Sequence, residues 1–224
     1  MIYFKSSFFD FFEELAVNNS KVWFDANRTR YEKDIKVVFD QFVKDLNQAI
    51  QEFDKEISLD YKKGIFRINR DIRFSKNKDP YKLNRSASFS KDPKNDMDNP
   101  GYYIDINPIN CYIAGGAWMP NPKHLKKIRQ EIYYNYDEFQ SIIEEPLFKK
   151  YFKTIQGARN VRLNPPESDY AKEIDFIFMK QFYFLLEFNP RRCLQDSFLD
   201  FCVERMQAAF PLNQFLRRSI EEIE

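Results

Sequence analysis

Glycine is scarce in this chain of 224 residues, which contains only five glycines. None of them follows the spacing G-x-G-x-x-G or G-x-x-x-x-G-K-[ST], in which glycines let backbone amides approach a phosphate. The sequence therefore disfavours a dinucleotide-binding fold and a P-loop.

Histidine is scarcer still, since His124 is the only one in the sequence. One chain with one histidine cannot form a multi-histidine zinc site or an iron site of two histidines and a carboxylate. A nucleophilic serine or cysteine would also depend on His124 as its only histidine base. We predict no metal site, and the sequence indicates no particular cofactor.

Cysteines and long apolar runs are few as well. The three cysteines, Cys111, Cys193 and Cys202, are odd in number and have no C-x-x-C spacing, which is typical of reduced thiols in a cytosolic protein. No uncharged apolar run reaches the roughly 18 residues of a membrane-spanning helix, and the first residues do not resemble a signal peptide. We expect a cytoplasmic protein with no membrane partner.

Aromatic residues are abundant, with 24 phenylalanines and 13 tyrosines, so a well-packed core is expected. Basic and acidic residues are almost equal, 35 against 34. A globally basic nucleic-acid-binding protein is therefore disfavoured, and an anionic partner would have to meet a local patch.

Hydrophobic periodicity predicts helices at both ends of the chain and strands between them. We expect a helix from Ser7 and one long helix or a broken pair over 21–53. Strands are predicted at 65–74, 86–90, 102–107, 111–118 and 182–188, and further helices at 122–132, 136–143, 146–155, 169–178, 195–210 and 212–223. The pattern indicates an α+β fold over residues 1–224, a single domain in which an antiparallel meander is flanked by N-terminal and C-terminal helices.

Positive charge is concentrated between Lys62 and Lys94. This stretch holds eleven basic and three acidic residues, so it carries +8 while the rest of the chain carries −7. Such asymmetry indicates either an anionic partner or pairing of the basic stretch with the acidic remainder.

Arg70 has an unusual position in the predicted strand 65–74. Strand periodicity places it on the apolar face, with Phe66, Ile68, Ile72 and Phe74. A buried arginine needs a carboxylate or a bound anion, unless a bulge near Asn69 turns it outward.

The candidate site residues come from this basic stretch and the strand after it. The predicted anion-binding residues are Arg67, Arg70, Arg73, Lys78, Tyr81 and Lys82, whose guanidinium, ammonium and phenol groups suit a phosphate or carboxylate. The candidate catalytic residues are Asp71, Tyr81 and Asp105. We expect neighbouring arginines to lower the pKa of Asp71, which favours a role as an anchor, and Asp105 is a possible partner of Arg70 or Arg73. Asp71 and Asp105 are possible Mg²⁺ ligands, although their spacing does not require the metal.

Adjacent glycines at Gly115 and Gly116 interrupt the predicted strand 111–118. Such a pair typically marks a bulge or the close approach of another backbone, and we favour this structural role over ligand binding.

Several motifs along the chain together resemble a bacterial and fungal family called domain of unknown function 2461. The motifs are Asn18-Asn19, Trp23-Phe24, Tyr31, Arg67-x-x-Arg70-Asp71-x-Arg73-Phe74-Ser75, Lys78-x-Pro80-Tyr81-Lys82, Tyr102-Tyr103, Gly115-Gly116-x-Trp118-x-Pro120 and Arg129. The resemblance spans nearly the whole chain and implies a single-domain protein of this length. It implies no activity, cofactor or partner.

Three functions are compatible with these observations. The first is a protein, either an enzyme or a binding protein, that binds a small phosphorylated or carboxylated ligand through the arginine-rich strand and turn. The second is a nucleic-acid-binding module that uses the basic stretch 62–94 as a hairpin. The third is a non-catalytic structural or interaction protein in which the arginines form internal salt bridges. We expect the first, and the sequence sets no oligomeric state.

Overall fold

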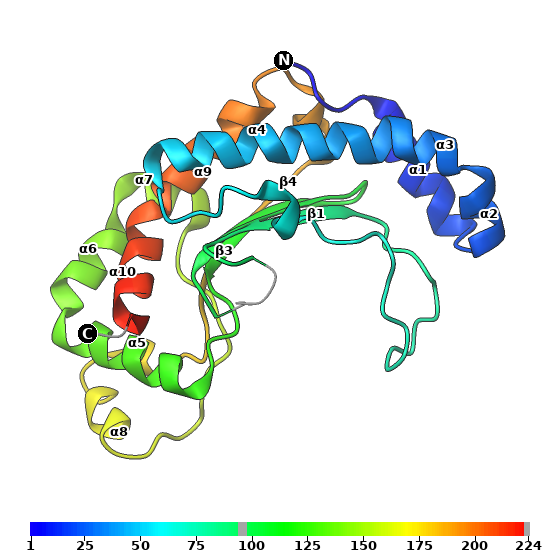
Figure 1. Ribbon diagram of the computed structural model, residues 1–224. Coiled ribbons are helices and arrows are strands. Elements are labelled where there is room, and N and C mark those ends of the chain that lie inside the picture. The colour runs from blue at the N-terminus through cyan, green and yellow to red at the C-terminus, as the bar shows by residue number, and fades with distance from the viewer. Residues whose placement is uncertain (94–97, 222–224) are drawn as a thin grey trace.

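The computed structural model describes residues 1–93 and 98–221 and has the outline of an arch (Figure 1). The long helix α4 (Val37–Phe53) lies across the top of the arch, above a four-stranded sheet. A hairpin descends on one side of the sheet, and C-terminal helices form the other side. The predicted α+β class is confirmed.

The N-terminal helices show a break within the predicted helical stretch 21–53. Helix α1 (Ser6–Val17) is followed by α2 (Lys21–Ala26), whose first turn is capped by the Ser20 hydroxyl, which accepts from the Trp23 amide. After Asn27 the chain continues through α3 (Arg28–Arg30) and the π-helical segment η1 (Tyr31–Lys36) into α4. The broken pair, rather than a single helix, is therefore the correct alternative.

The sheet is an antiparallel meander in the order β1-β2-β3-β4. Its strands are β1 (Arg85–Phe89), β2 (Gly101–Ile106), β3 (Cys111–Ala117) and β4 (Phe182–Phe188). Ala87, Ile104, Ile113 and Leu186 lie opposite one another across the four strands and face the helices. These strands lie within a residue of their predicted positions because each has one apolar face that the helices cover.

The C-terminal helices are α5 (Pro122–Tyr134), α6 (Tyr136–Glu144), α7 (Pro146–Phe152), α8 (Glu167–Tyr170), α9 (Phe198–Ala208) and α10 (Phe210–Ile220), with 3₁₀ turns η2 (Tyr61–Gly64), η3 (Asp175–Phe178) and η4 (Pro190–Leu194). Of the C-terminal helices, α7, α9 and α10 contact the sheet, and the others pack around them. The predicted helix 169–178 is wrong, because Ile174 takes an extended conformation and both Ile174 and Ile177 are buried in the core. Among the described residues, no helix combines the length and the apolar character that crossing a membrane requires.

The core is largely aromatic where the N-terminal helices meet α9. The Phe42 ring lies 5.3 Å from Tyr3, 5.2 Å from Phe4 and 5.1 Å from Phe198, measured between ring centroids. The rings of Phe4, Phe42 and Phe198 are fully buried. This cluster joins the N-terminal helices to α9 and, through the ring of Phe188, to β4.

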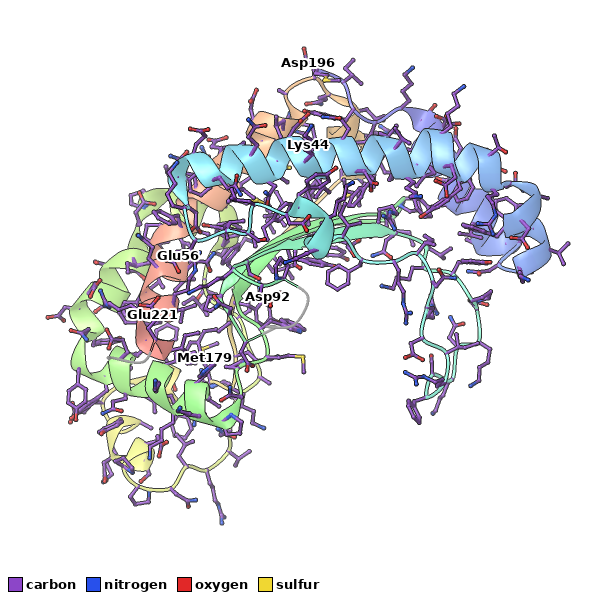
Figure 2. The ribbon with its side chains drawn as sticks, in the orientation of Figure 1. Lys44, Glu56, Asp92, Met179, Asp196 and Glu221 are labelled. Atoms are coloured by element: carbon purple, nitrogen blue, oxygen red, sulfur yellow. The ribbon has the colours of Figure 1, made fainter. Side chains whose placement is uncertain are left out.

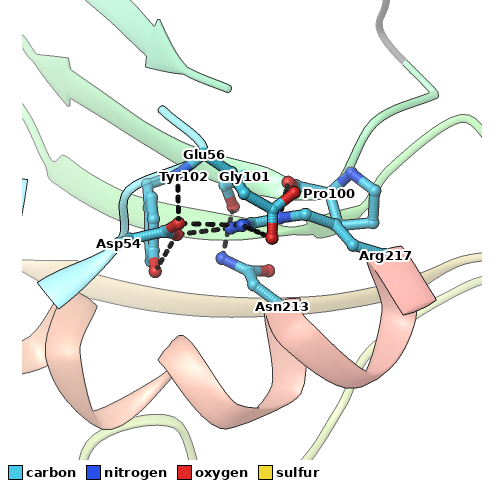
Figure 3. Close-up of polar contacts among 7 residues, drawn as sticks. All are labelled: Asp54, Glu56, Pro100, Gly101, Tyr102, Asn213 and Arg217. Carbon is cyan, nitrogen blue, oxygen red and sulfur yellow. Dashed lines mark hydrogen bonds and ion pairs between the residues drawn. The ribbon is translucent and has the colours of Figure 1, made fainter. Parts of the chain in front are cut away.

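A buried ion pair joins the end of α4 to α10 (Figure 3). Both guanidinium ends of Arg217 donate to the Asp54 carboxylate, and the Arg217 Nε donates to the Pro100 carbonyl over 3.0 Å. The Tyr102 hydroxyl also donates to Asp54, over 2.9 Å, and Glu56 lies 3.1 Å from Arg217. The network ties β2 to both helices.

The paired glycines lie where two backbones approach each other. A Cβ atom at Gly116 would be 2.3 Å from the Phe182 carbonyl oxygen, and the residue has a φ of 97°. A Cβ atom at Gly115 would be 2.2 Å from the Gly101 carbonyl oxygen. The predicted structural role of the pair, a close approach of another backbone, is confirmed.

Residues 65–82, which we call the basic hairpin, do not form the predicted strand 65–74. Ile65 pairs with Ala87 at the edge of β1, after which the chain leaves the sheet and pairs with itself, Asn69 against Tyr81. From 70 to 80 every residue is exposed or half-buried, and Phe74 is 96% exposed. Figure 2 shows the side chains of the hairpin spread into open space on both of its sides. Because the alternation from Phe66 to Phe74 has no sheet to lie in, Arg70 is half-buried instead of facing the core.

Candidate functional site

A cavity of about 540 Å³ lies between the N-terminal helices and the root of the basic hairpin. We call it the basic cavity, because five basic and two acidic side chains line it: Arg28, Lys36, Lys62, Arg67 and Arg85, with Glu32 and Asp40. The excess of positive charge makes this the strongest candidate site for an anion.

Arg85 is the most deeply buried cation of the basic cavity, with 4% of its surface exposed. It lies on the helix-facing side of β1, and its guanidinium is 5.1 Å from the centre of the Phe39 ring. One nitrogen donates to the Phe66 carbonyl over 2.9 Å, whereas the carboxylate of Asp40 is 3.9 Å away. The Arg85 Nε has no hydrogen-bond partner among residues 1–93 and 98–221. A buried guanidinium with so little compensation makes Arg85 a candidate ligand for an anion.

The remaining charges of the basic cavity differ in how they are compensated. Arg28 pairs with Asp25 at 2.5 Å and Lys36 with Glu32 at 2.7 Å, all on exposed helix surface. Within residues 1–93 and 98–221, neither Lys62 nor Arg67 has a carboxylate within 4 Å. These two cations are therefore available to a ligand beside Arg85.

Aromatic rings form one wall of the basic cavity. The rings of Phe24 and Tyr81 are stacked with their centroids 4.0 Å apart, and Tyr31 lies 4.9 Å from Phe24. Tyr81 is held by Asn19, whose side-chain amide donates to the Tyr81 carbonyl and accepts from the Tyr81 amide, over 3.0 and 3.1 Å. Burial raises the pKa of Tyr81, and Asp25 raises it further, so its phenol stays protonated and can donate a hydrogen bond.

Of the predicted anion-binding residues, Arg67 and Tyr81 line the basic cavity, whereas the others lie outside it. Arg73 pairs with Asp71 at 2.7 Å on the exposed hairpin. Lys78 donates to the Ile72 carbonyl over 2.9 Å. The structure therefore divides the predicted set between the cavity and the hairpin.

Lys82 lies beside the basic cavity, with its ammonium 5.4 Å from the centre of the Phe66 ring. Burial lowers the pKa of Lys82, and the positive charges of Arg67, Arg85 and Arg70 lower it further. These four cations consequently form one region of positive potential around Phe66. Arg70 and Arg67 form no ion pair with any residue in the described part of the chain.

The three candidate catalytic residues are not brought together. Hydrogen bonds from the side chain and backbone of Arg73 lower the pKa of Asp71 to about 2, which is the predicted direction; its role as an anchor stays a prediction. Asp105 is buried and accepts from Asn84, Tyr103 and Asn107. The prediction that Asp105 pairs with Arg70 or Arg73 is wrong, since its carboxylate accepts from other side chains on and beside the sheet, and Arg73 pairs with Asp71. No hydrogen bond or ion pair in the described residues joins Asp71, Tyr81 and Asp105 to one another.

Sequence reasoning missed the cavity residues contributed by other elements: Arg28, Lys36 and Asp40 from the N-terminal helices, and Arg85 from β1. The helix residues have no local signal, because they meet the hairpin only through tertiary packing. Arg85 did have one, since strand periodicity places it on the same face as Ala87 and Phe89, which are apolar.

The described residues contain no group of three or more histidine, cysteine, aspartate or glutamate side chains arranged to hold a metal ion. No curated protein and no solved structure shows significant similarity to the chain. The sequence model of one family, described as conserved hypothetical protein (DUF2461), matches residues 7–215. Because this match covers nearly the whole chain, the protein belongs to that family.

Proposed function

We propose that the protein binds a small phosphorylated or carboxylated compound in the basic cavity. The observation that carries the proposal is Arg85, a buried guanidinium on the cavity wall whose Nε lacks a partner in the part of the chain that the structure describes. An anion held by Arg85, Arg67 and Lys62 supplies the missing countercharge, and charge-assisted hydrogen bonds of this kind are among the strongest in proteins.

The test of this proposal is the replacement of Arg85 by methionine, which keeps much of the side-chain volume. Hydrogen bonds to charged groups contribute about 1.5–3 kcal/mol each, so we expect R85M to bind pyrophosphate or citrate about 10- to 100-fold more weakly. Isothermal titration calorimetry at constant ionic strength measures this change. R73M is the matched control, because Arg73 lies outside the cavity and pairs with Asp71. Binding by R85M as tight as by the unaltered protein would contradict the proposal.

Anion affinity is expected to depend on pH through Asp40. Burial raises the pKa of Asp40 above its ordinary 3.8, and the facing cations Arg85, Lys36 and Lys62 lower it only in part. As the pH falls through this raised pKa, the carboxyl becomes neutral and stops competing with an anion for Arg85. An anion that shifts the Asp40 pKa by about one unit binds about tenfold more tightly to the protonated form.

Sulfate is the suitable probe for this pH dependence, because it keeps both charges as the pH is lowered from 7 toward about 4. We expect its affinity to increase over that range in the unaltered protein and to be high and nearly independent of pH in D40N. Glu32 also faces Asp40 but pairs with Lys36, and E32Q serves as the control that retains the pH dependence. An equal pH profile for D40N and the unaltered protein would exclude Asp40 as the controlling group.

A second candidate function, binding of single-stranded nucleic acid, is supported by the exposed part of the basic hairpin. Arg67, Arg73, Lys76 and Lys78 are exposed there beside the fully accessible ring of Phe74. Each phosphate contact adds about −0.7 to the slope of log affinity against log salt for a single strand. This function would be favoured over the small-anion site if the salt dependence of oligonucleotide affinity is steep and K76Q/K78Q reduces it. R85M should then bind the oligonucleotide as tightly as the unaltered protein does.

A further inference from the structure

A second cavity, of about 430 Å³, lies on the face of the sheet opposite the helices. We call it the aromatic cleft, because seven of its lining residues are aromatic: Phe66, Phe89, Tyr102, Tyr103, Tyr112, Trp118 and Tyr183. This volume falls within the range of small-molecule sites, which are mostly apolar with a few polar groups.

The register of the sheet explains how the aromatic cleft is formed. On the central strand β3, Ala114 lies opposite Tyr103 of β2 and Leu185 of β4, and Gly116 lies opposite Tyr183. Small residues therefore form the floor and larger side chains the walls. A flat group can enter between the rings, and a bulky side chain at position 114 would occupy the space.

Two walls of the aromatic cleft offer hydrogen-bonding groups as well as ring faces. The hydroxyls of Tyr112 and Tyr183 make no hydrogen bond to any residue in 1–93 or 98–221. Trp118 is 49% exposed, and its ring packs edge-on against Tyr183 with centroids 4.6 Å apart. Aromatic faces with free hydroxyls beside them match a planar heterocycle, which has a π surface and polar atoms at its edge.

The aromatic cleft and the basic cavity share the residue Phe66. The Phe66 ring lies 6.1 Å from the ring of Tyr103, and the ammonium of Lys82 lies 5.4 Å from the Phe66 ring. The next residue, Arg67, lines the basic cavity. Positive charge therefore adjoins the aromatic cleft at the Phe66 end.

We infer that the ligand is a phosphorylated compound with a planar heterocyclic ring, a mononucleotide in chemical class. Its ring occupies the aromatic cleft, and its phosphate reaches the cations around Phe66. This inference rests on the proposed function, since it adds a ring site to the anion site.

The experiment compares AMP with its two halves, adenosine and inorganic phosphate. In W23F the remaining tryptophan is Trp118, so stacking of a ring in the cleft is read as quenching of its fluorescence. Stacking of a base on an aromatic side chain changes affinity by about five- to 100-fold. We expect AMP to bind at least tenfold more tightly than phosphate and to quench Trp118.

Variants separate the two parts of the site. Y112A and A114L are expected to weaken AMP binding about tenfold or more while leaving phosphate binding unchanged, and R85M to weaken both. F74S is the matched control, because Phe74 is an aromatic residue outside the cleft.

Each of the other outcomes contradicts one part of the inference: the ring site, the anion site or the identity of the ligand. If phosphate binds in an Arg85-dependent way but AMP binds no more tightly, the ring site is wrong and the proposed function stands. If adenosine alone binds in a Tyr112-dependent way and phosphate does not bind, the anion site fails and with it the combined ligand. Tighter binding of a single-stranded oligonucleotide than of AMP, abolished by salt, replaces the mononucleotide by a nucleic acid.

Discussion

Replacing Asp54 with alanine is expected to lower the free energy of unfolding by about 3–5 kcal/mol. Arg217, whose side chain is 3% exposed, would keep its buried charge and lose both hydrogen bonds to the Asp54 carboxylate. The Tyr102 hydroxyl would lose its acceptor in the same step. Urea unfolding followed by circular dichroism measures the change.

Two further variants show whether the loss comes from the buried charge. The double variant D54L/R217M removes both charges, and we expect it to recover much of the lost stability, because apolar replacements of buried ion pairs are often neutral. D71A breaks the exposed pair with Arg73 and should leave the unfolding midpoint unchanged. A midpoint for D54A equal to that of the unaltered protein would show that Arg217 finds another partner.

Replacing Phe42 with alanine is expected to cost about 3–5 kcal/mol of unfolding free energy. The residue is fully buried, and its ring contacts those of Tyr3, Phe4 and Phe198. The cavity left behind would separate the N-terminal helices from α9, so the whole cluster loses contacts. Denaturant unfolding, with tryptophan fluorescence and circular dichroism as separate probes, measures the effect.

The control for Phe42 is the same replacement at Phe74, which is exposed and should change stability by less than about 0.5 kcal/mol. F42L retains part of the apolar volume and should fall between the two. Equal losses for F42A and F74A would mean that the aromatic cluster does not carry the packing described.

The strands and most helices could be predicted because each has one face that the core covers. Tyr102, Ile104 and Ile106 alternate with the residues between them in the sequence, and all three are buried in the structure, in a sheet that the helices cover. The same alternation at Phe66 and Phe74 led to a wrong strand, because periodicity does not reveal whether a neighbouring strand is present. Only Ile65 pairs with β1, at Ala87, and the residues after it find no strand beside them. Which strands lie side by side is decided by the packing of the whole chain and not by the local sequence.

The candidate site was only partly predictable for a related reason. Arg67 and Tyr81 lie in a conspicuously basic stretch, whereas Arg28 and Asp40 reach the basic cavity from helices about forty residues earlier in the chain. Charge density in the sequence points to the hairpin as a whole. Burial of Arg85, and not local charge, distinguishes the cavity from the exposed hairpin.

The side chain of Asn19 fixes which residue of the second arm of the basic hairpin faces the turn between α1 and α2. It pairs with both the N–H and the C=O of Tyr81, as a neighbouring strand would. A shift by one residue in one direction would present Pro80, which has no N–H, and in the other Lys82, whose N–H already bonds to the Ile68 carbonyl. One side-chain amide from the turn between α1 and α2 therefore admits a single alignment, and the N-terminal helices fix the position of the aromatic wall at Tyr81.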